Sequence, residues 1–132
     1  MPSATDSAAN LNASGKCVLL VEDDRSVRRY LEVTLKRWGY RVLTAGDGLE
    51  AMKVAMSAAV DAVVTDAVMP HMSGHELVRF LRGNTKLSKL PIVLLSGQEN
   101  QQAGAVANNV DAFLYKPIKA EDLKNCLTKL FS

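Results

Sequence analysis

The sequence predicts one α/β domain in which helices cover both faces of a parallel sheet. Short apolar runs alternate with amphipathic segments along the chain, an order typical of strand–helix units. The runs at 17–21 and 92–95 are apolar at every position, as in strands buried on both faces. The 132 residues, 48% of them hydrophobic, are enough for one domain with a real core. We expect right-handed crossovers between the strands.

The composition gives little sign of a charged partner. Sixteen basic and fourteen acidic residues leave a formal charge of +2, which favours neither nucleic acid nor a membrane surface. No apolar run approaches the roughly 18 residues needed to span a bilayer. Cys17 and Cys126 lie in apolar patterns without metal or redox spacing, as expected in a reducing compartment. We therefore expect a cytoplasmic protein that contacts neither nucleic acid nor membrane.

Residues 1–15 differ in composition from the rest of the chain. They are mostly Ala, Ser, Asn and Thr, with no hydrophobic periodicity. Such a segment cannot bury enough apolar surface to order itself. We predict a disordered leader or linker over 1–15 and a folded domain over 16–132.

The first strand–helix unit starts with the apolar run 17–21. Three acidic residues follow at once, and the apolar residues after them recur at helical spacing: Val27, Leu31, Leu35 and Trp38. Gly39 suits the left-handed residue that commonly ends a helix. The sequence therefore predicts a strand, an acidic turn and a helix.

The second unit consists of a strand over 41–45 and a helix from about 47 to 57. Leu49, Met52 and Met56 fall on one face of that helix. An apolar stripe at helical spacing is typical of a core-facing surface. We expect these three side chains to pack in the core.

The third unit has a strand over 62–65 that ends in Asp66, because Pro70 cannot continue a central strand. A helix then opens at Ser73 or Gly74, and its apolar residues are Leu77, Phe80 and Leu81. His71 and His75 are four residues apart, but a loop or helix start lies between them. We therefore expect surface histidines rather than a metal-binding pair.

The last two strands are predicted over 91–96 and 111–115. The first ends in the hydroxyl of Ser96, and Gly97 allows the backbone to turn there. Residues 98–109 have few large apolar side chains, so we expect only a marginal fourth helix. Lys116 and Pro117 follow the fifth strand, and a final amphipathic helix has the apolar residues Leu123, Cys126, Leu127, Leu130 and Phe131.

Polar groups follow four of these strands at what should be one edge of the sheet. Ligands of open α/β sheets bind outside the carboxyl ends of the strands. Each group alone has an ordinary explanation as a helix cap, a turn former or a solvated lysine, but their joint occurrence indicates a site. Carboxylate oxygens suit Mg²⁺, and a lysine and a hydroxyl suit a phosphoryl group. Asp66 would be the nucleophile. The predicted site contains Glu22, Asp23, Asp66, Ser96 and Lys116.

With these motifs in order and at approximate spacing, residues 16–132 resemble the receiver domains of two-component response regulators. The matching motifs are the acidic pair after the first strand, the Asp-x-x-Met-Pro-x-Met-x-Gly run over 66–74, Ser96-Gly97 and Lys116-Pro117. The resemblance implies a doubly wound, five-stranded parallel sheet of strand order 2-1-3-4-5. It also implies that the peptide bond before Pro117 is cis.

The resemblance implies roles for the acidic residues. Asp66 is the phosphoacceptor, Asp23 binds Mg²⁺ directly, Glu22 binds it through water, and Val68 binds it through its carbonyl. Spacing back from Asp66 favours Glu22–Asp23 as the acidic pair, with Asp24 capping the first helix, but Asp23–Asp24 stays open.

The resemblance also selects the residues that respond to phosphorylation. The switch residues are Ser96 and Phe113. The aromatic switch position lies three residues before the lysine, at Phe113, which lacks the hydroxyl of the commoner tyrosine. The signal is then read on the face formed by the fourth helix, the fifth strand and the last helix. Val68 and Gln98 flank the path of the hydrolytic water and hold no general base, so we expect slow self-dephosphorylation.

Three functions from different classes remain to be compared. The leading one is a signalling phosphoacceptor, not an enzyme acting on other substrates, that receives its phosphoryl group from a histidine kinase or histidine phosphotransfer protein. It is either freestanding or part of a hybrid kinase or longer regulator. A Mg²⁺-dependent phosphohydrolase would need Asp-x-Asp where this chain has Glu22-Asp23-Asp24. A flavodoxin-like cofactor binder would need a Gly-rich phosphate loop there. The kinase, the signal, the target and the oligomeric state do not follow from the sequence.

Overall fold

The computed structural model describes residues 15–97 and 109–132. The predicted fourth helix, over 98–109, falls almost entirely outside the described residues. No helix in the described ranges is both long and apolar enough to cross a membrane. The described elements are, in order, β1 (Cys17–Val21), α2 (Arg25–Arg37), β2 (Arg41–Ala45), α3 (Gly48–Ser57), β3 (Ala62–Asp66), α4 (Gly74–Gly83), β4 (Ile92–Ser96), β5 (Ala112–Tyr115) and α6 (Ala120–Phe131).

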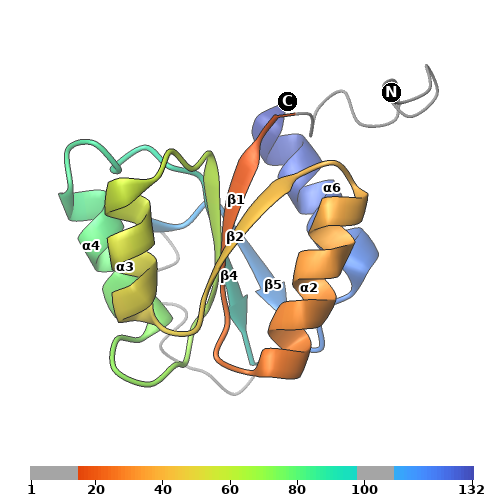
Figure 1. Cartoon of the computed structure of the whole chain (residues 1–132), viewed down its shortest axis with the longest axis horizontal. Helices are drawn as coiled ribbons and strands as arrows, with labels where there is room; N and C mark the ends of the chain where they lie inside the picture. The colour runs from red at the N-terminus through yellow and green to blue at the C-terminus, as the bar shows by residue number, and fades with distance from the viewer. Residues whose placement is uncertain (1–14, 98–108) are drawn as a thin grey trace.

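The five strands form one parallel sheet in the order β2-β1-β3-β4-β5, which confirms the predicted fold class. Helices α2 and α6 cover one face, and α3 and α4 cover the other (Figure 1). Val21 is level with Thr65, and Asp66 is level with Leu95. The carboxyl ends of β1, β3 and β4 therefore meet at one edge of the sheet.

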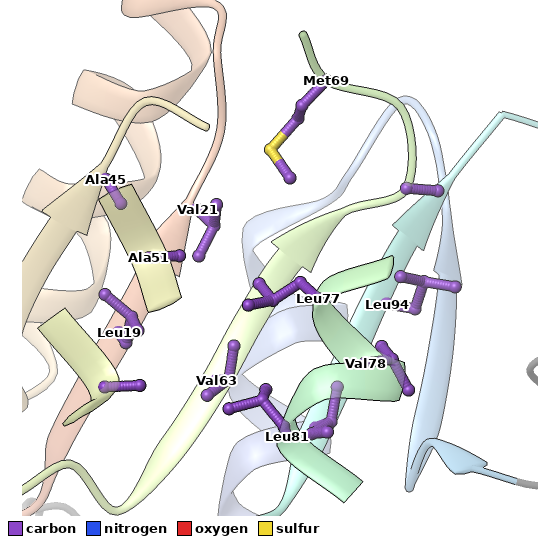
Figure 2. Close-up of a cluster of buried hydrophobic side chains, with 13 residues drawn as sticks. Leu19, Val21, Ala45, Ala51, Val63, Met69, Leu77, Val78, Leu81 and Leu94 are labelled. Atoms are coloured by element: carbon purple, nitrogen blue, oxygen red, sulfur yellow. The ribbon is translucent and has the colours of Figure 1, made fainter. Parts of the chain in front are cut away.

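Two apolar layers hold the sheet between the helices. Strands β1, β3 and β4 are buried at every position, as their unbroken apolar runs predict. Leu19, Val63 and Leu94 point toward α3 and α4, where they pack against α4 side chains such as Leu77 and Leu81 (Figure 2). The alternate strand residues point toward α2 and α6 and pack against Leu31, Leu35, Leu123 and Leu127. Each fully buried leucine contributes about 2 kcal/mol to folding.

Side-chain caps fix where the helices begin. Asp24 accepts a hydrogen bond from Val27 N (3.0 Å) at the start of α2, which confirms its predicted capping role. Asp47 caps α3 in the same way. Ser73 and Glu76 form a reciprocal capping box at α4. At the end of α2, Gly39 adopts the expected left-handed conformation, with φ at 99°.

The prediction for the buried face of α3 is wrong for Leu49 and Met56, whereas Met52 is partly buried and packs against the core as predicted. Leu49 and Met56 are 41% and 63% exposed, and the buried residues of the helix are Gly48, Ala51 and Ala55. At Gly48 only a small residue fits, because the loop before α4 passes very close. A Cβ built at Gly48 would overlap the Met72 carbonyl oxygen, which accepts a hydrogen bond from Gly48 N.

The prediction of two surface histidines holds for only one of them. His71 is exposed, has a φ of 68°, and its Nδ1 lies 2.8 Å from Asp47 Oδ2. His75 is only 8% exposed, and this burial lowers its pKa. His75 is one of the buried residues at the start of α4, together with Gly74 and Leu77.

The start of α4 gives a test of the packing. A Cβ at Gly74 would overlap the Asp66 carbonyl oxygen and lie 2.8 Å from Ala67 Cα, whereas nothing lies within 4 Å of one at Gly83. We expect Gly74→Ala to lower the free energy of unfolding by about 2 kcal/mol or more, since the obstructing atoms are backbone. Gly83→Ala, on the same helix, should be neutral or stabilising by up to about 1 kcal/mol. Urea unfolding measures both, and equal midpoints for the two variants would contradict the packing.

Candidate functional site

The site lies at the carboxyl ends of the strands. Glu22 and Asp23 directly follow β1, Asp66 ends β3, and Lys116 directly follows β5. One carboxylate oxygen from each of the three acids lies within 4.8 Å of the other two. The structure therefore brings together the acidic residues and the lysine that the sequence placed at separate strand ends.

Lys116 joins two of the acids. Its Nζ lies 2.9 Å from Asp66 Oδ1 and 3.6 Å from Glu22 Oε1. Burial alone would lower the pKa of Lys116, but the hydrogen bond to Asp66 and the charges of both carboxylates outweigh it, so the pKa is raised. The lysine stays charged at neutral pH. The Lys116–Pro117 peptide bond is cis, as predicted.

Glu22 is the most deeply buried of the acids. It is 1% exposed, and its pKa rises from 4.5 to about 7, mainly through burial, with a further contribution from the charge of Asp66. A hydrogen bond from Asp24 N (3.1 Å) and the nearby Lys116 oppose that rise. Among the described residues, no group donates a hydrogen bond to Glu22 Oε1, and its ion-pair partner Lys116 Nζ lies 3.6 Å away, beyond hydrogen-bond distance. A buried carboxylate oxygen in this state suits a bound cation.

The three acids with converging oxygens are Glu22, Asp23 and Asp66, and not Asp24. The Asp24 side chain caps α2 and is exposed. This geometry agrees with the register that sequence spacing favours. All three converging groups are hard oxygen donors, and one lysine does not balance their charge. The described residues therefore fit a divalent cation such as Mg²⁺.

Hydrogen bonds fix the first two carbonyl groups of the turn that begins at Asp66. Thr65 Oγ1 donates to the Asp66 carbonyl oxygen (3.0 Å), and Gly74 N donates to the Ala67 carbonyl oxygen (3.0 Å). Met69 is buried against the α3–α4 side of the core, as Figure 2 shows. The Val68 side chain is 67% exposed. The backbone of this turn is therefore fixed by α4, while the Val68 side chain faces solvent.

The predicted switch residues lie on neighbouring strands. Ser96 is fully buried, and its hydroxyl donates to the Gly97 carbonyl oxygen (3.1 Å). Phe113 is partly buried against the α3–α4 side of the core, and its ring stacks on Tyr115 at 6.5 Å between centroids. Gln98 lies outside the described residues. The hydroxyl of Ser96 thus already has a hydrogen-bond acceptor within its own turn.

An apolar pocket of about 320 Å³ opens beside Lys116, between α2 and the loop after β5. Tyr30 on its rim is 51% exposed. The remaining lining residues are Ser26, Val27, Leu31, Pro117 and Ile118. The site is therefore flanked by a surface that offers apolar contact within reach of Lys116.

Sequence reasoning missed one residue at the site. Arg28 Nη1 donates to the carbonyl oxygen of Glu22 (2.8 Å). The available signal was a basic residue four positions after the helix cap Asp24, close enough to reach back over the first turn. Such a residue is usually solvated, so its position alone gave no reason to select it.

Comparisons with known proteins agree with this geometry. A family model described as the response regulator receiver domain matches residues 18–128. Over 108 residues, 80% of this chain, the chain is 36% identical to hybrid signal transduction histidine kinase D of Dictyostelium discoideum. Over the same length it is 37% identical to response regulator MprA of Mycobacterium tuberculosis. It spans 7% of the first relative and 46% of the second.

The fold matches solved receiver domains as well. One is the receiver domain of sensor histidine kinase PA1611 from Pseudomonas aeruginosa, which is 28% identical, with a TM-score of 0.82. The match covers 89% of this chain and 98% of that one, and that structure is described as having a magnesium ion coordinated in its active site cleft. Motif order, site geometry and family match thus agree that this chain belongs to the response regulator receiver domains, the phosphoacceptor modules of two-component and phosphorelay signalling.

Proposed function

We propose that residues 16–132 form a receiver domain whose Asp66 accepts a phosphoryl group. The observation that carries the proposal is the Lys116 ammonium 2.9 Å from Asp66 Oδ1, in a cluster of three converging carboxylates. Asp66 is only 4% exposed, so few water molecules screen these charges. A fixed cation beside a buried carboxylate supports attack by that carboxylate on a phosphorus atom.

The proposed transfer is a displacement at phosphorus. An Asp66 carboxylate oxygen forms a bond to phosphorus while the bond from phosphorus to a donor histidine nitrogen breaks. The electron pair of that bond leaves on the nitrogen, and the other ring nitrogen carries a proton, so a neutral imidazole departs. Lys116 neutralises oxygens of the phosphoryl group, and the Ser96 hydroxyl donates to one after turning away from Gly97.

The converging oxygens support Mg²⁺ as the cofactor. Asp23 and Asp66 would bind it directly, Glu22 through water, and Val68 through its carbonyl. When bound, Mg²⁺ supplies positive charge that stabilises the phosphoryl oxygens. Its presence would also relieve the repulsion among the three acids, which Lys116 alone does not balance.

The donor is proposed to be a histidine kinase or a histidine phosphotransfer protein. The apolar pocket beside Lys116, with Tyr30 and Ile118 on its walls, offers a surface on which the donor can place its histidine near Asp66. The chain would act on no other substrate and would not contact nucleic acid or membrane. Both cysteines are free, which fits a reducing, cytoplasmic setting.

Ser96 and Phe113 are proposed to transmit the conformational response to phosphorylation. Turning of the Ser96 hydroxyl toward a phosphoryl oxygen would alter packing on β4, and Phe113 lies on the neighbouring strand, level with Leu94. The readout face would be formed by β5, α6 and the predicted helix over 98–109. Residues 1–15 are proposed to be a leader or linker, and the domain is proposed to be either freestanding or part of a hybrid kinase or longer regulator.

The acceptor assignment is tested by labelling with a small radioactive phosphodonor in Mg²⁺. We expect Asp66→Asn to abolish labelling while the fold persists, because the amide keeps the shape but is no nucleophile. Asp23→Asn should slow labelling about tenfold or more through weaker Mg²⁺ binding. Asp24→Asn is the matched control, since asparagine caps a helix equally well. Labelling of Asp66→Asn at the parent level, or its loss in Asp24→Asn, would contradict the assignment.

The raised pKa of Glu22 predicts how stability depends on pH without Mg²⁺. Between pH 4.5 and about 7 the folded state holds this proton more tightly than the unfolded state, so the free energy of unfolding falls as pH rises. Glu22→Gln should remove this slope and raise the free energy of unfolding at pH 8 by about 1 to 3 kcal/mol. Urea titrations at pH 5 and pH 8 compare the two proteins. An unchanged slope in the variant would show that another group is responsible.

The lifetime of the phosphorylated protein is expected to be long. The Val68 side chain offers no hydrogen bond to orient a water molecule at the acyl phosphate. Val68→Asn should speed loss of label about tenfold, less than the roughly hundredfold effect of a positioned general base. Loss of label from isolated protein in Mg²⁺ measures this, with Gln98→Glu alongside. If the parent loses its label within seconds and neither variant is faster, the explanation is wrong.

A further inference from the structure

Arg28 links α2 to the acidic turn. Its backbone N donates to the Asp24 carbonyl oxygen (2.9 Å) as part of the first helical turn. Its side chain turns back past the start of the helix, and Nη1 donates to the carbonyl oxygen of Glu22 (2.8 Å). A hydrogen bond from a guanidinium is charge-assisted and roughly twice as strong as a neutral one.

This hydrogen bond acts on the peptide that leads into Asp23. The Glu22 carbonyl and the Asp23 amide belong to one planar group, so fixing the oxygen fixes the direction in which Asp23 leaves the turn. Glu22 itself is held by burial and by Asp24 N, and Asp66 is held by Lys116. Asp23 is exposed, so its position depends more on the backbone than that of the other two acids.

The neighbouring loop after β2 completes the support of this peptide. The Ala45 carbonyl oxygen accepts from Glu22 N (3.1 Å), so the Glu22 backbone is bonded at both its N–H and its carbonyl. A Cβ built at Gly46 would lie 3.4 Å from Arg28 Nη1. Gly46 N is in turn bonded to Glu50 Oε1 (2.6 Å). The Arg28 guanidinium therefore lies against a second loop that is itself held in place.

We propose that Arg28 is a positioning residue for the cation site: it holds the Glu22–Asp23 peptide so that the Asp23 carboxylate points toward Asp66. This inference rests on the proposed function, because it assumes that Asp23 and Asp66 bind Mg²⁺. Arg28 touches neither the cation nor the phosphoryl group. Its loss should therefore weaken Mg²⁺ binding more than it slows transfer at saturating Mg²⁺.

Calorimetric titration of the full chain with Mg²⁺ tests the proposal directly. Arg28→Met keeps most of the side-chain stem and removes the donors, and we expect Mg²⁺ to bind about five- to tenfold more weakly. Arg29→Met removes the same charge from the next, exposed position of α2 and should change the affinity less than about twofold. Arg28→Lys, which keeps a donor without the planar fork, should recover part of the loss.

A second measurement separates positioning from general damage to the fold. In labelling with a small phosphodonor, Arg28→Met should raise the half-saturating Mg²⁺ concentration by the factor seen in calorimetry and lower the rate at saturation far less. Thermal unfolding identifies a variant that does not fold. In that case Gly46→Val replaces it, since its branched side chain would crowd the guanidinium that a Cβ there already contacts at 3.4 Å, and it should weaken Mg²⁺ binding in the same direction.

The outcomes are distinguishable. If the parent binds Mg²⁺ and folded Arg28→Met binds it equally well, the Arg28 inference is wrong while the proposed function stands. Equal losses in Arg28→Met and Arg29→Met would point to a general disturbance of α2, since removal of a positive charge by itself favours cation binding, and would also overturn it. If the parent itself binds no Mg²⁺ and takes no label, the proposed function fails.

Discussion

Repulsion among three carboxylates is the constraint on which the rest of this structure depends. Oxygens of Glu22, Asp23 and Asp66 lie within 4.8 Å of one another. Two like charges 4 Å apart repel by about 4 kcal/mol at an effective dielectric constant of 20. Lys116 offsets part of this repulsion. The pKa of Glu22 is raised to about 7, mainly by burial and further by the charge of Asp66, so its proton also reduces the repulsion below that pH. Such a cluster of like charges fits the proposed binding of a cation and a phosphoryl group, whose charges would complete the site.

The fold keeps the acids together by giving their backbone no freedom to separate. β1 and β3 are neighbours in register and buried at every position, so moving Glu22 away from Asp66 would disturb both apolar layers. On the far side of Asp66, the close approach of Gly74 ties the turn to the first residue of α4. The rigidity of the sheet and the tight approach of α4 therefore keep the three carboxylates close together despite their mutual repulsion.

The strands and the acidic site could be predicted because their signals are local. An unbroken apolar run indicates a buried strand, and a polar residue at its end must then lie at the sheet edge. The inward face of α3 could not be predicted in this way, because two sets of residues recur at helical spacing. One set is Leu49, Met52 and Met56, and the other is Gly48, Ala51 and Ala55. The face that is buried follows from how α3 packs on the sheet and the loop before α4, where Met72 passes over Gly48. The bond from Arg28 to Glu22 also depends on how a helix and a turn meet, which no single segment encodes.

Phosphorylation of Asp66 would alter the charge balance rather than merely add a group. A carboxylate with one negative charge would be replaced by an acyl phosphate with nearly two, at a position where Lys116 is already in use. The Ser96 hydroxyl is bonded within its own turn, and a hydroxyl rotates to suit its surroundings. The backbone of Ser96 need not move when the hydroxyl rotates. Its carbonyl oxygen accepts a hydrogen bond from Lys116 N (2.8 Å), directly after β5. Ser96 is thus joined to Lys116 through the backbone, so in the proposed mechanism a turn of its hydroxyl toward a phosphoryl oxygen would act next to the end of β5.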